Sequence, residues 1–169
     1  ANEAMLMVAE GVKPALIENA AIAMGMPIGP LAVVDETTLQ LGYDIMTSTK
    51  EEMGDAYVSS GTEELMEIMV KQIDRRGRRF GGGFYEYADD GSKKLWPGLA
   101  DHFPLAEEQP DVEEVKQRLM FIQLIATAQC FDEGVVSDPQ SADLGAIFGW
   151  GFAPWTGGPM SHIDTMGVD

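Results

Sequence analysis

Gly25-Met26-Pro27-Ile28-Gly29-Pro30-Leu31-Ala32-Val33-Val34-Asp35 is the stretch on which the expected fold depends. Its first six residues hold two glycines and two prolines, a density that predicts the end of one helix, a sharp turn and a new helix. Gly25 follows apolar residues at helical spacing, so we expect it just past a helix end. Pro30 suits the first turn of the next helix. Asp35 is expected about a turn and a half further, near the positive end of that helix dipole.

The apolar side chains of this corner allow two interpretations. A Gly-Pro corner between two helices is usually a structural corner and nothing more. The alternative is that a rigid bend exposes apolar groups, which then form the wall of a pocket for an apolar ligand. On this second hypothesis the exposed apolar groups are Met26, Pro27, Ile28 and Leu31. The candidate binding residues of the corner are Met26, Pro27, Gly29, Pro30 and Leu31.

Composition sets limits on the class of protein. The 169 residues suffice for one domain or two small ones, and 45% hydrophobic content is ordinary for a soluble globular chain. A net charge of -17 argues against general nucleic-acid binding, and no apolar run reaches the length of a membrane span. The single cysteine suits a reducing compartment, so we expect a cytoplasmic protein. Because residue 1 is Ala and already looks helical, we expect a piece of a longer chain.

Few residues are candidates for reaction chemistry. Cys130 lies in an apolar helical run and is expected to be core filler. His102 and His162 have no ligand-like spacing around them, so neither predicts a metal or a general base. The glycines at 81–83 do not form GxGxxG, so they predict no dinucleotide-binding loop. We therefore expect no catalytic residue, no cofactor-binding residue and no metal ligand in this chain.

Apolar residues at helical spacing predict a mostly helical chain. One helix is expected from Pro30 to about Ile45, and a capping box at Ser60 and Glu63 precedes another. A long helix should begin at Asp111, end at Gly134 and bury one apolar face. The expected helical segments are residues 3–10, 14–24, about 30–45, 63–76, 111–134, from 139 and from 159. The expected inward residues are Leu31, Val34, Thr38, Leu41 and Ile45 in the third helix, and Val112, Val115, Leu119, Ile122, Ala126 and Cys130 in the long helix.

A basic cluster, Arg75, Arg76, Arg78 and Arg79, stands out in the acidic chain. Arg75 and Arg76 are expected in the last turn of a helix, where cations suit the dipole. The simple interpretation is helix capping and solvation, and the alternative is contact with an anion such as phosphate. The aromatic run at 84–87 is expected to form a short extended segment.

An internal repeat relates the two halves of the sequence. Glu10-Gly11-Val12 matches Glu133-Gly134-Val135, and Gly29-Pro30 with Asp35 matches Gly158-Pro159 with Asp164. Glu18 and Asp143 fall at comparable places between these motifs. The predicted fold class is therefore all-α, a duplicated helical unit with a short extended aromatic segment between its copies. The expected boundaries are 1–96 for the first repeat, 97–110 for a linker, and 111–169 for a second, C-terminally truncated repeat.

These motifs together resemble one family. Asn2-Glu3-Ala4, Glu10-Gly11-Val12, the corner at 25–30 with Asp35, and the run from Arg78 to Tyr87 occur in the order found in the C-terminal helical domain of L-3-hydroxyacyl-CoA dehydrogenases. The second copy, with Gly149 to Pro159 and Ile163-Asp164, resembles the extra repeat of multifunctional fatty-acid oxidation alpha subunits.

The resemblance implies an NAD-dependent oxidation of L-3-hydroxyacyl-CoA in the parent protein. It places the NAD-binding Rossmann domain and the catalytic His and Glu N-terminal to this chain, so the fragment alone is expected to be inactive. The helical module would close over the acyl-CoA and make subunit contacts, in a homo-oligomer or a complex with a thiolase. The alternative is a helical assembly module with no ligand of its own. The helical domain of another hydroxyacid dehydrogenase family fits less well, because the corner is duplicated and the aromatic segment is present.

Overall fold

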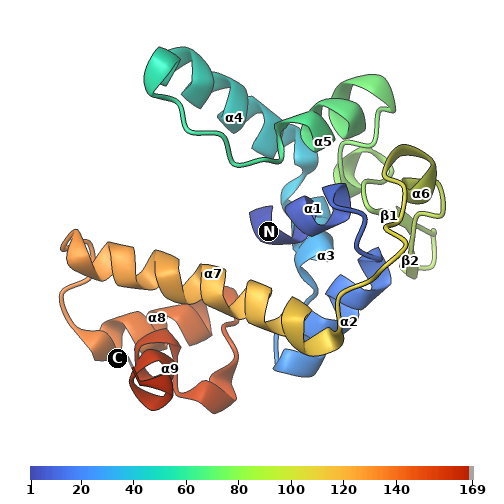
Figure 1. Ribbon diagram of the computed structural model, residues 1–169. Coiled ribbons are helices and arrows are strands. Elements are labelled where there is room, and N and C mark those ends of the chain that lie inside the picture. The colour runs from blue at the N-terminus through green and yellow to red at the C-terminus, as the bar shows by residue number, and fades with distance from the viewer. Residues whose placement is uncertain (168–169) are drawn as a thin grey trace. The chain divides into compact units, whose positions relative to one another are not determined.

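The computed structural model describes residues 1–167 (Figure 1). The chain is mostly helical, as predicted, with one small antiparallel sheet of two strands. In the sheet, Tyr85 pairs with Leu95 and Tyr87 pairs with Lys93. The elements are α1 Asn2–Ala9, α2 Pro14–Met24, α3 Pro30–Thr37, α4 Leu39–Met53, α5 Glu63–Glu67, β1 Tyr85–Tyr87, β2 Lys93–Leu95, α6 Leu99–His102, α7 Val112–Asp132, α8 Pro139–Trp150 and α9 Pro159–Met166.

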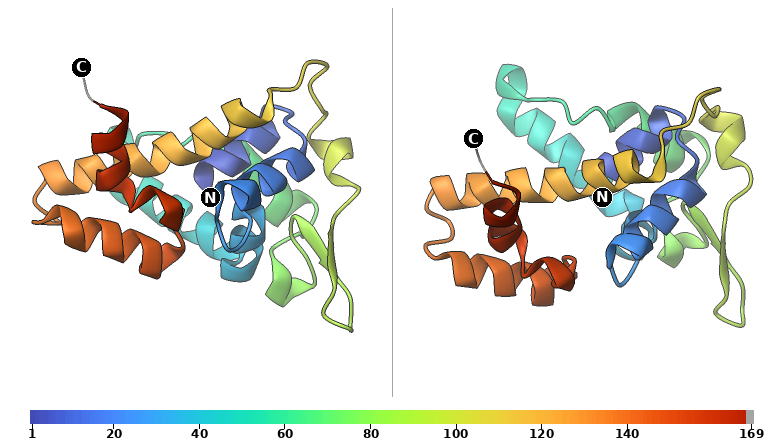
Figure 2. Two further views of the ribbon diagram at one scale, coloured as in Figure 1. Left: turned by 90° about the horizontal axis from the view of Figure 1, so that it is seen from below. Right: turned by 60° about the horizontal axis from the view of Figure 1, so that its bottom comes forward.

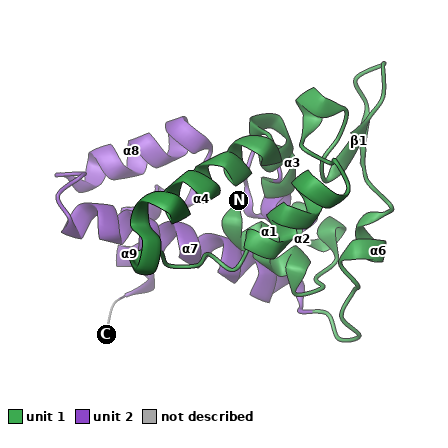
Figure 3. Cartoon of the chain, turned by 90° about the horizontal axis from the view of Figure 1, so that it is seen from above, with its two compact units in different colours: residues 1–18, 30–109 green, residues 19–29, 110–169 purple. Residues whose placement is uncertain are grey.

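The chain divides into two compact units (Figure 3). Residues 1–18 and 30–109 form the first unit, and residues 19–29 and 110–169 form the second. The division falls inside the first corner, between Gly29 and Pro30. This division into compact units does not test the predicted boundaries of the internal repeat. Those boundaries, 1–96, 97–110 and 111–169, stay a prediction.

In the first unit, the helix expected from Pro30 to Ile45 is in fact two helices. α3 ends at Thr37, and Thr38 has a φ of +72°, outside the helical region. The Thr38 hydroxyl then accepts a hydrogen bond from Leu41 N at 3.2 Å and caps α4. The break rotates α4 away from the core, so Leu41 and Ile45 are exposed instead of buried. The prediction of one continuous apolar face across Thr38 was therefore wrong.

The capping box predicted at Ser60 and Glu63 forms only in part, because α5 begins at Glu63 itself and its N-cap residue, Thr62, makes no side-chain cap hydrogen bond. Ser60 N donates to Glu63 Oε1 at 2.8 Å, and the Ser59 hydroxyl donates to Glu63 Oε2 at 2.9 Å. The helix runs into a π-helical turn at Ile68–Gln72 and ends there. Arg75 and Arg76 thus follow the last turn rather than lie in it, which corrects the prediction for both residues.

The second unit is built from α7, α8 and α9 and the end of α2. α9 packs against both α7 and α8, and Figure 2 shows this arrangement from two sides. Asp111 caps α7 as predicted, because its carboxylate accepts a hydrogen bond from Glu114 N at 2.8 Å. Val115 and Leu119 are buried on α7 as predicted. Val112, Ile122 and Ala126 are exposed, and Met120, Leu124 and Thr127 are buried instead, so the predicted inward face pointed partly in the wrong direction.

Among the helices of residues 1–167, none combines the length and the apolar character needed to cross a bilayer.

Candidate functional site

The corner residues chosen from the sequence differ in exposure. Pro27 is exposed and Met26 is half-buried, whereas Gly29, Pro30 and Leu31 are buried. Leu31 has no exposed surface at all and belongs to the core of the first unit. Of the five candidates, only Met26 and Pro27 thus present side chains to solvent.

Glu18 fixes the beginning of the helix that follows the corner. Its Oε1 accepts a hydrogen bond from Leu31 N at 2.8 Å, and its Oε2 accepts one from the Tyr85 hydroxyl. Pro30 has no N–H, so Leu31 N is among the first donors of α3 that need a partner. Glu18 therefore joins α2, α3 and the aromatic strand β1 within the first unit.

The buried position of Glu18 changes its acidity. Burial raises the pKa of this carboxyl above the usual value, and the hydrogen bonds from Tyr85 and Leu31 only partly oppose the change. The proton is therefore held more tightly in the folded chain than in the unfolded chain. The stability that this provides is present below the ordinary pKa of Glu and is lost as pH rises through the raised pKa.

The raised pKa of Glu18 predicts how the stability of the variant Glu18→Gln depends on pH. A neutral amide can accept from Leu31 N with its oxygen and donate to the Tyr85 oxygen with its NH2 group, but it cannot ionise. The variant should therefore lose less stability than the wild type as pH rises above about 4.3, the ordinary pKa of Glu. Urea unfolding of both chains at several pH values measures the difference. Parallel curves for the two chains would show that Glu18 does not titrate as described.

Asp35 holds the glycine-rich loop that precedes β1. Its Oδ1 accepts from Phe84 N at 2.8 Å, and its Oδ2 accepts from Tyr85 N at 2.9 Å and from the Tyr87 hydroxyl at 3.0 Å. Burial raises the pKa of this carboxyl, and these hydrogen bonds act in the opposite direction. The carboxylate lies so close to Gly83 that a Cβ there would collide with Oδ1. The expected contact of Asp35 with its own helix dipole is thus replaced by a long-range anchor.

Arg75 holds the same loop from its other side. Its Nε donates to the Gly83 carbonyl at 2.6 Å and its Nη2 donates to the Tyr85 carbonyl at 2.7 Å. The guanidinium also lies 4.1 Å from the centre of the Trp96 ring. Arg75 therefore binds backbone carbonyls of the loop. This role differs from both interpretations of the basic cluster, helix capping and anion contact.

Of the other three arginines in the basic cluster, two pair with carboxylates and one is exposed. Arg76 lies 2.7 Å from the Asp74 carboxylate, and Arg78 lies 2.5 Å from that of Glu36. Arg79 is exposed. These are surface pairs of small energetic value.

The second unit contains a comparable anchor. Asp143 Oδ1 accepts from Met160 N at 2.7 Å, directly after Pro159, and its Oδ2 accepts from the Ser161 hydroxyl at 2.6 Å. A Cβ on Gly158 would collide with the Asp143 side chain, and Gly158 has a φ of +118°. Asp143 thus holds the start of α9 much as Glu18 holds the start of α3.

Within the second unit, the part of the first corner from Met24 to Pro27 lies against Gly151 and Trp155. A Cβ on Gly151 would come within 2.5 Å of Pro27 Cγ. Trp155 Nε1 donates to the Met24 carbonyl at 2.6 Å and covers Gly25. The corner is therefore held rigidly from one side, while Pro27 remains partly accessible.

The histidines and the cysteine have structural surroundings. His102 stacks on Trp96 and His162 meets the Trp155 ring edge-on, each at 5.8 Å between ring centres. Cys130 is half-buried in α7. Within residues 1–167, no three His, Cys, Asp or Glu side chains are grouped so as to hold a metal ion. The arrangement orders backbone and positions apolar surface.

The fold and its anchored corners define a helical module stabilised by buried carboxylates. Residues 1–87 match the family model of the 3-hydroxyacyl-CoA dehydrogenase C-terminal domain. This match covers more than half of the chain, which therefore belongs to that family.

Relatives of known name agree with this assignment. The chain is 30% identical over 174 residues to the fatty acid oxidation complex subunit alpha of Shewanella sp. (strain ANA-3), covering 99% of this chain and 24% of the relative. It is 31% identical over 171 residues to the subunit of the same name from Shewanella loihica (strain ATCC BAA-1088 / PV-4), covering 99% of this chain and 23% of the relative. The chain thus spans about a quarter of the length of these relatives.

A solved structure shares the fold. The dehydrogenase part of multifunctional enzyme 1 from C. elegans matches with a TM-score of 0.57 and 23% identity, over 79% of this chain and 30% of that one. At this identity the match supports the helical architecture alone.

Proposed function

We propose that this chain is the substrate-side helical region of an NAD-dependent L-3-hydroxyacyl-CoA dehydrogenase that acts in fatty-acid oxidation. The observation that carries the proposal is the family match over residues 1–87, which includes the anchored loop and the first corner. In this proposal the acyl-CoA and NAD belong to the parent enzyme, and a separate Rossmann domain binds the NAD.

We further propose that the first corner borders the acyl chain of the substrate. Met26 and Pro27 supply the accessible apolar surface, and buried Gly29, Pro30 and Leu31 keep the bend rigid. Glu18 and its hydrogen bond to Leu31 N fix the direction in which α3 leaves the bend. Preorganised apolar surface is what an acyl-binding wall needs, because little ordering remains to be done on binding.

The duplicated unit is also part of the proposal. Glu18 and Asp143 both accept a hydrogen bond from the N–H that follows the proline of a Gly-Pro pair, at 2.8 Å from Leu31 and at 2.7 Å from Met160. Two unrelated helical pairs have no reason to share this arrangement together with the matching sequence motifs. The second repeat would then be a modified copy of the first.

A chimeric enzyme tests the proposed function. This chain would replace the matching segment of the Shewanella sp. (strain ANA-3) alpha subunit, and NADH-dependent reduction of acetoacetyl-CoA would be measured. We expect the chimera to retain activity and a variant from which the segment is deleted to lose it. A correctly folded chimera without activity would contradict the proposal.

The chain by itself is expected to be inactive. The same assay on purified residues 1–169 should give no turnover above background, because the two histidines contact tryptophan rings instead of a carboxylate. An inactive homogeneous preparation with a cooperative thermal transition is the informative result. Turnover by this chain would show that it contains a reaction centre of its own.

An assembly role is the second candidate, and exposed apolar residues favour it. In the second unit Phe121 and Ile125 on α7 and Leu144 and Phe148 on α8 are exposed, and Phe148 is 83% accessible. Apolar surface of this kind marks protein contacts. Such contacts fit a homo-oligomer or a thiolase-containing complex, and a mass measurement of the chimera separates these two from a monomer.

A further inference from the structure

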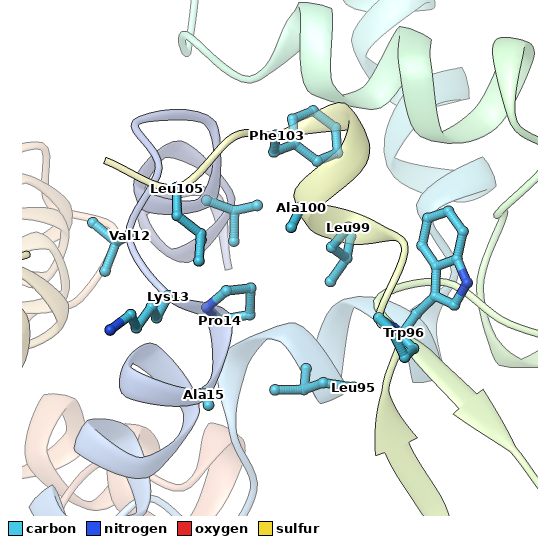
Figure 4. Close-up of a pocket in the computed structure, with 12 residues that line it drawn as sticks. Val12, Lys13, Pro14, Ala15, Leu95, Trp96, Leu99, Ala100, Phe103 and Leu105 are labelled. Carbon is cyan, nitrogen blue, oxygen red and sulfur yellow. The ribbon is translucent and has the colours of Figure 1, made fainter. Parts of the chain in front are cut away.

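A hollow of about 260 Å³ lies in the first unit, apart from the corner and its carboxylates. It is formed by the start of α2 on one side and by β2 and α6 on the other (Figure 4). Its wall contains Pro14, Ala15, Leu95, Leu99, Ala100 and Leu105, and Trp96 and Phe103 extend it. Figure 4 shows these side chains surrounding an open centre.

Hydrogen bonds between residues 11–13 and residues 106–109 hold the frame of this hollow. Gly11 O accepts from Ala106 N and from Gln109 Nε2, each at 2.9 Å, and Lys13 N donates to Gln109 Oε1 at 2.8 Å. Gly11 has a φ of +87°, and a Cβ there would lie 2.6 Å from Ala106 N. The glycine is therefore required for the close approach of the two segments.

The wall beneath Trp96 is equally fixed. Trp96 N donates to the Phe84 carbonyl at 2.8 Å, and the ring contacts both the Arg75 guanidinium and the ring of His102. A hollow with a rigid frame does not close when it is empty. Apolar cavities of about 150 Å³ stay dry and bind benzene, so this larger hollow of about 260 Å³ has room for an aliphatic chain of medium length.

The rim of the hollow has a positive charge. Lys13 lies at the edge, and Figure 4 shows its ammonium directed outward, where the flexible stem allows it to reach a ligand at the mouth. In the part of the chain that the structure describes, this ammonium has no hydrogen-bond or ion-pair partner. The N-terminal end of α2, eleven residues long, adds a partial positive charge beside it. Both features are local exceptions in a chain with a net charge of -17.

We propose that this hollow is a binding site for a medium-chain aliphatic carboxylate. The aliphatic tail lies in the hollow, and the carboxylate meets Lys13 at the rim. The site does not depend on the proposed dehydrogenase function, because none of its wall residues belongs to the corner.

Octanoate and octanol are suitable probes, because they share a tail and differ in charge. Methyl spectra of residues 1–169 would be recorded while each probe is added. We expect saturable shifts at Val12, Leu99 and Leu105 and none at Leu144 or Val135 in the second unit. Absence of saturation, or equal shifts at Leu144 and Leu99, would overturn the site.

Variants separate the tail from the head group. Lys13→Gln should weaken octanoate about two- to fivefold, the size of one exposed ion pair, and leave octanol unchanged. Ala100→Phe puts a ring in the hollow from an exposed position and should abolish binding of both probes. Ala128→Phe, at an exposed position on α7, is the matched control and should bind both normally.

Two further results decide the proposal. If Lys13→Gln binds octanoate as well as the wild type does, the carboxylate assignment is wrong. If Ala100→Phe does not fold, Ala15→Phe fills the same hollow from the exposed surface of α2 and replaces it in the test. Unchanged octanoate binding in a folded filling variant would contradict the proposed position of the tail.

Discussion

Replacing Asp35 by alanine should lower the free energy of unfolding by about 3 kcal/mol or more, because buried donors lose their only acceptor at about 1–3 kcal/mol each. Asp35 has no exposed surface, and Phe84 N, Tyr85 N and the Tyr87 hydroxyl all donate to it. Urea unfolding followed by circular dichroism measures the loss.

The neighbouring carboxylate provides a matched control. Glu36 pairs with Arg78 on the surface, so Glu36→Ala should change the unfolding free energy by about 1 kcal/mol or less. Asp35→Asn should fall between the two, because an amide presents one oxygen where the carboxylate presents two. If Asp35→Ala were as stable as Glu36→Ala, the anchor would carry little of the stability of the first unit.

Local features of the sequence predicted local structure well. Gly11, Gly25 and Pro30 mark helix ends and starts where the structure has them, because glycine and proline act on their own backbone. The Asp111 cap of α7 was found for the same reason, and of the predicted capping box at Ser60 and Glu63 the contact through Ser60 N forms. Each of these signals involves residues fewer than five apart.

Long-range polar contacts could not be predicted from such short-range sequence signals. Asp35 finds its partners 49 to 52 residues away, and Glu18 meets Tyr85 67 residues away, and no spacing rule connects them. The nearest signal was Gly82-Gly83 before the aromatic run, since a glycine that is not needed for a turn often marks a close approach by another group. Such a reading would have indicated a crowded loop, but not that Asp35 crowds it.

The break at Thr38 shows how periodicity misleads. Apolar residues continue at spacings of three and four from Leu31 to Ile45, so the pattern favours one helix. A threonine with positive φ interrupts it and turns the remaining apolar residues toward solvent. Tertiary packing, and not the pattern, decided where the helix ended.

Replacing Leu31 by aspartate should unfold the first unit. The side chain has no exposed surface, and burying an unpaired charge costs at least several kcal/mol, a large part of the stability of a typical domain, about 5–15 kcal/mol. The carboxylate of Glu18, which accepts from Leu31 N, would repel the new charge. Thermal melting of the variant should show a greatly lowered transition or none.

Two companion variants turn this result into a test of the corner. Leu31→Met keeps the volume and should cost less than about 1.5 kcal/mol, which would show that the position needs an apolar group and not leucine itself.

Met26→Asp places the same charge on the half-buried side of the bend, where solvent can reach it. In the chimeric enzyme, Met26→Asp should leave the melting temperature nearly unchanged and lower kcat/KM for acyl-CoA, because the charge would lie beside the acyl chain. If Met26→Asp keeps full activity, the corner is purely structural and the proposed acyl contact is wrong. If instead Leu31→Asp melts like the wild type and loses only activity, Leu31 itself faces the substrate.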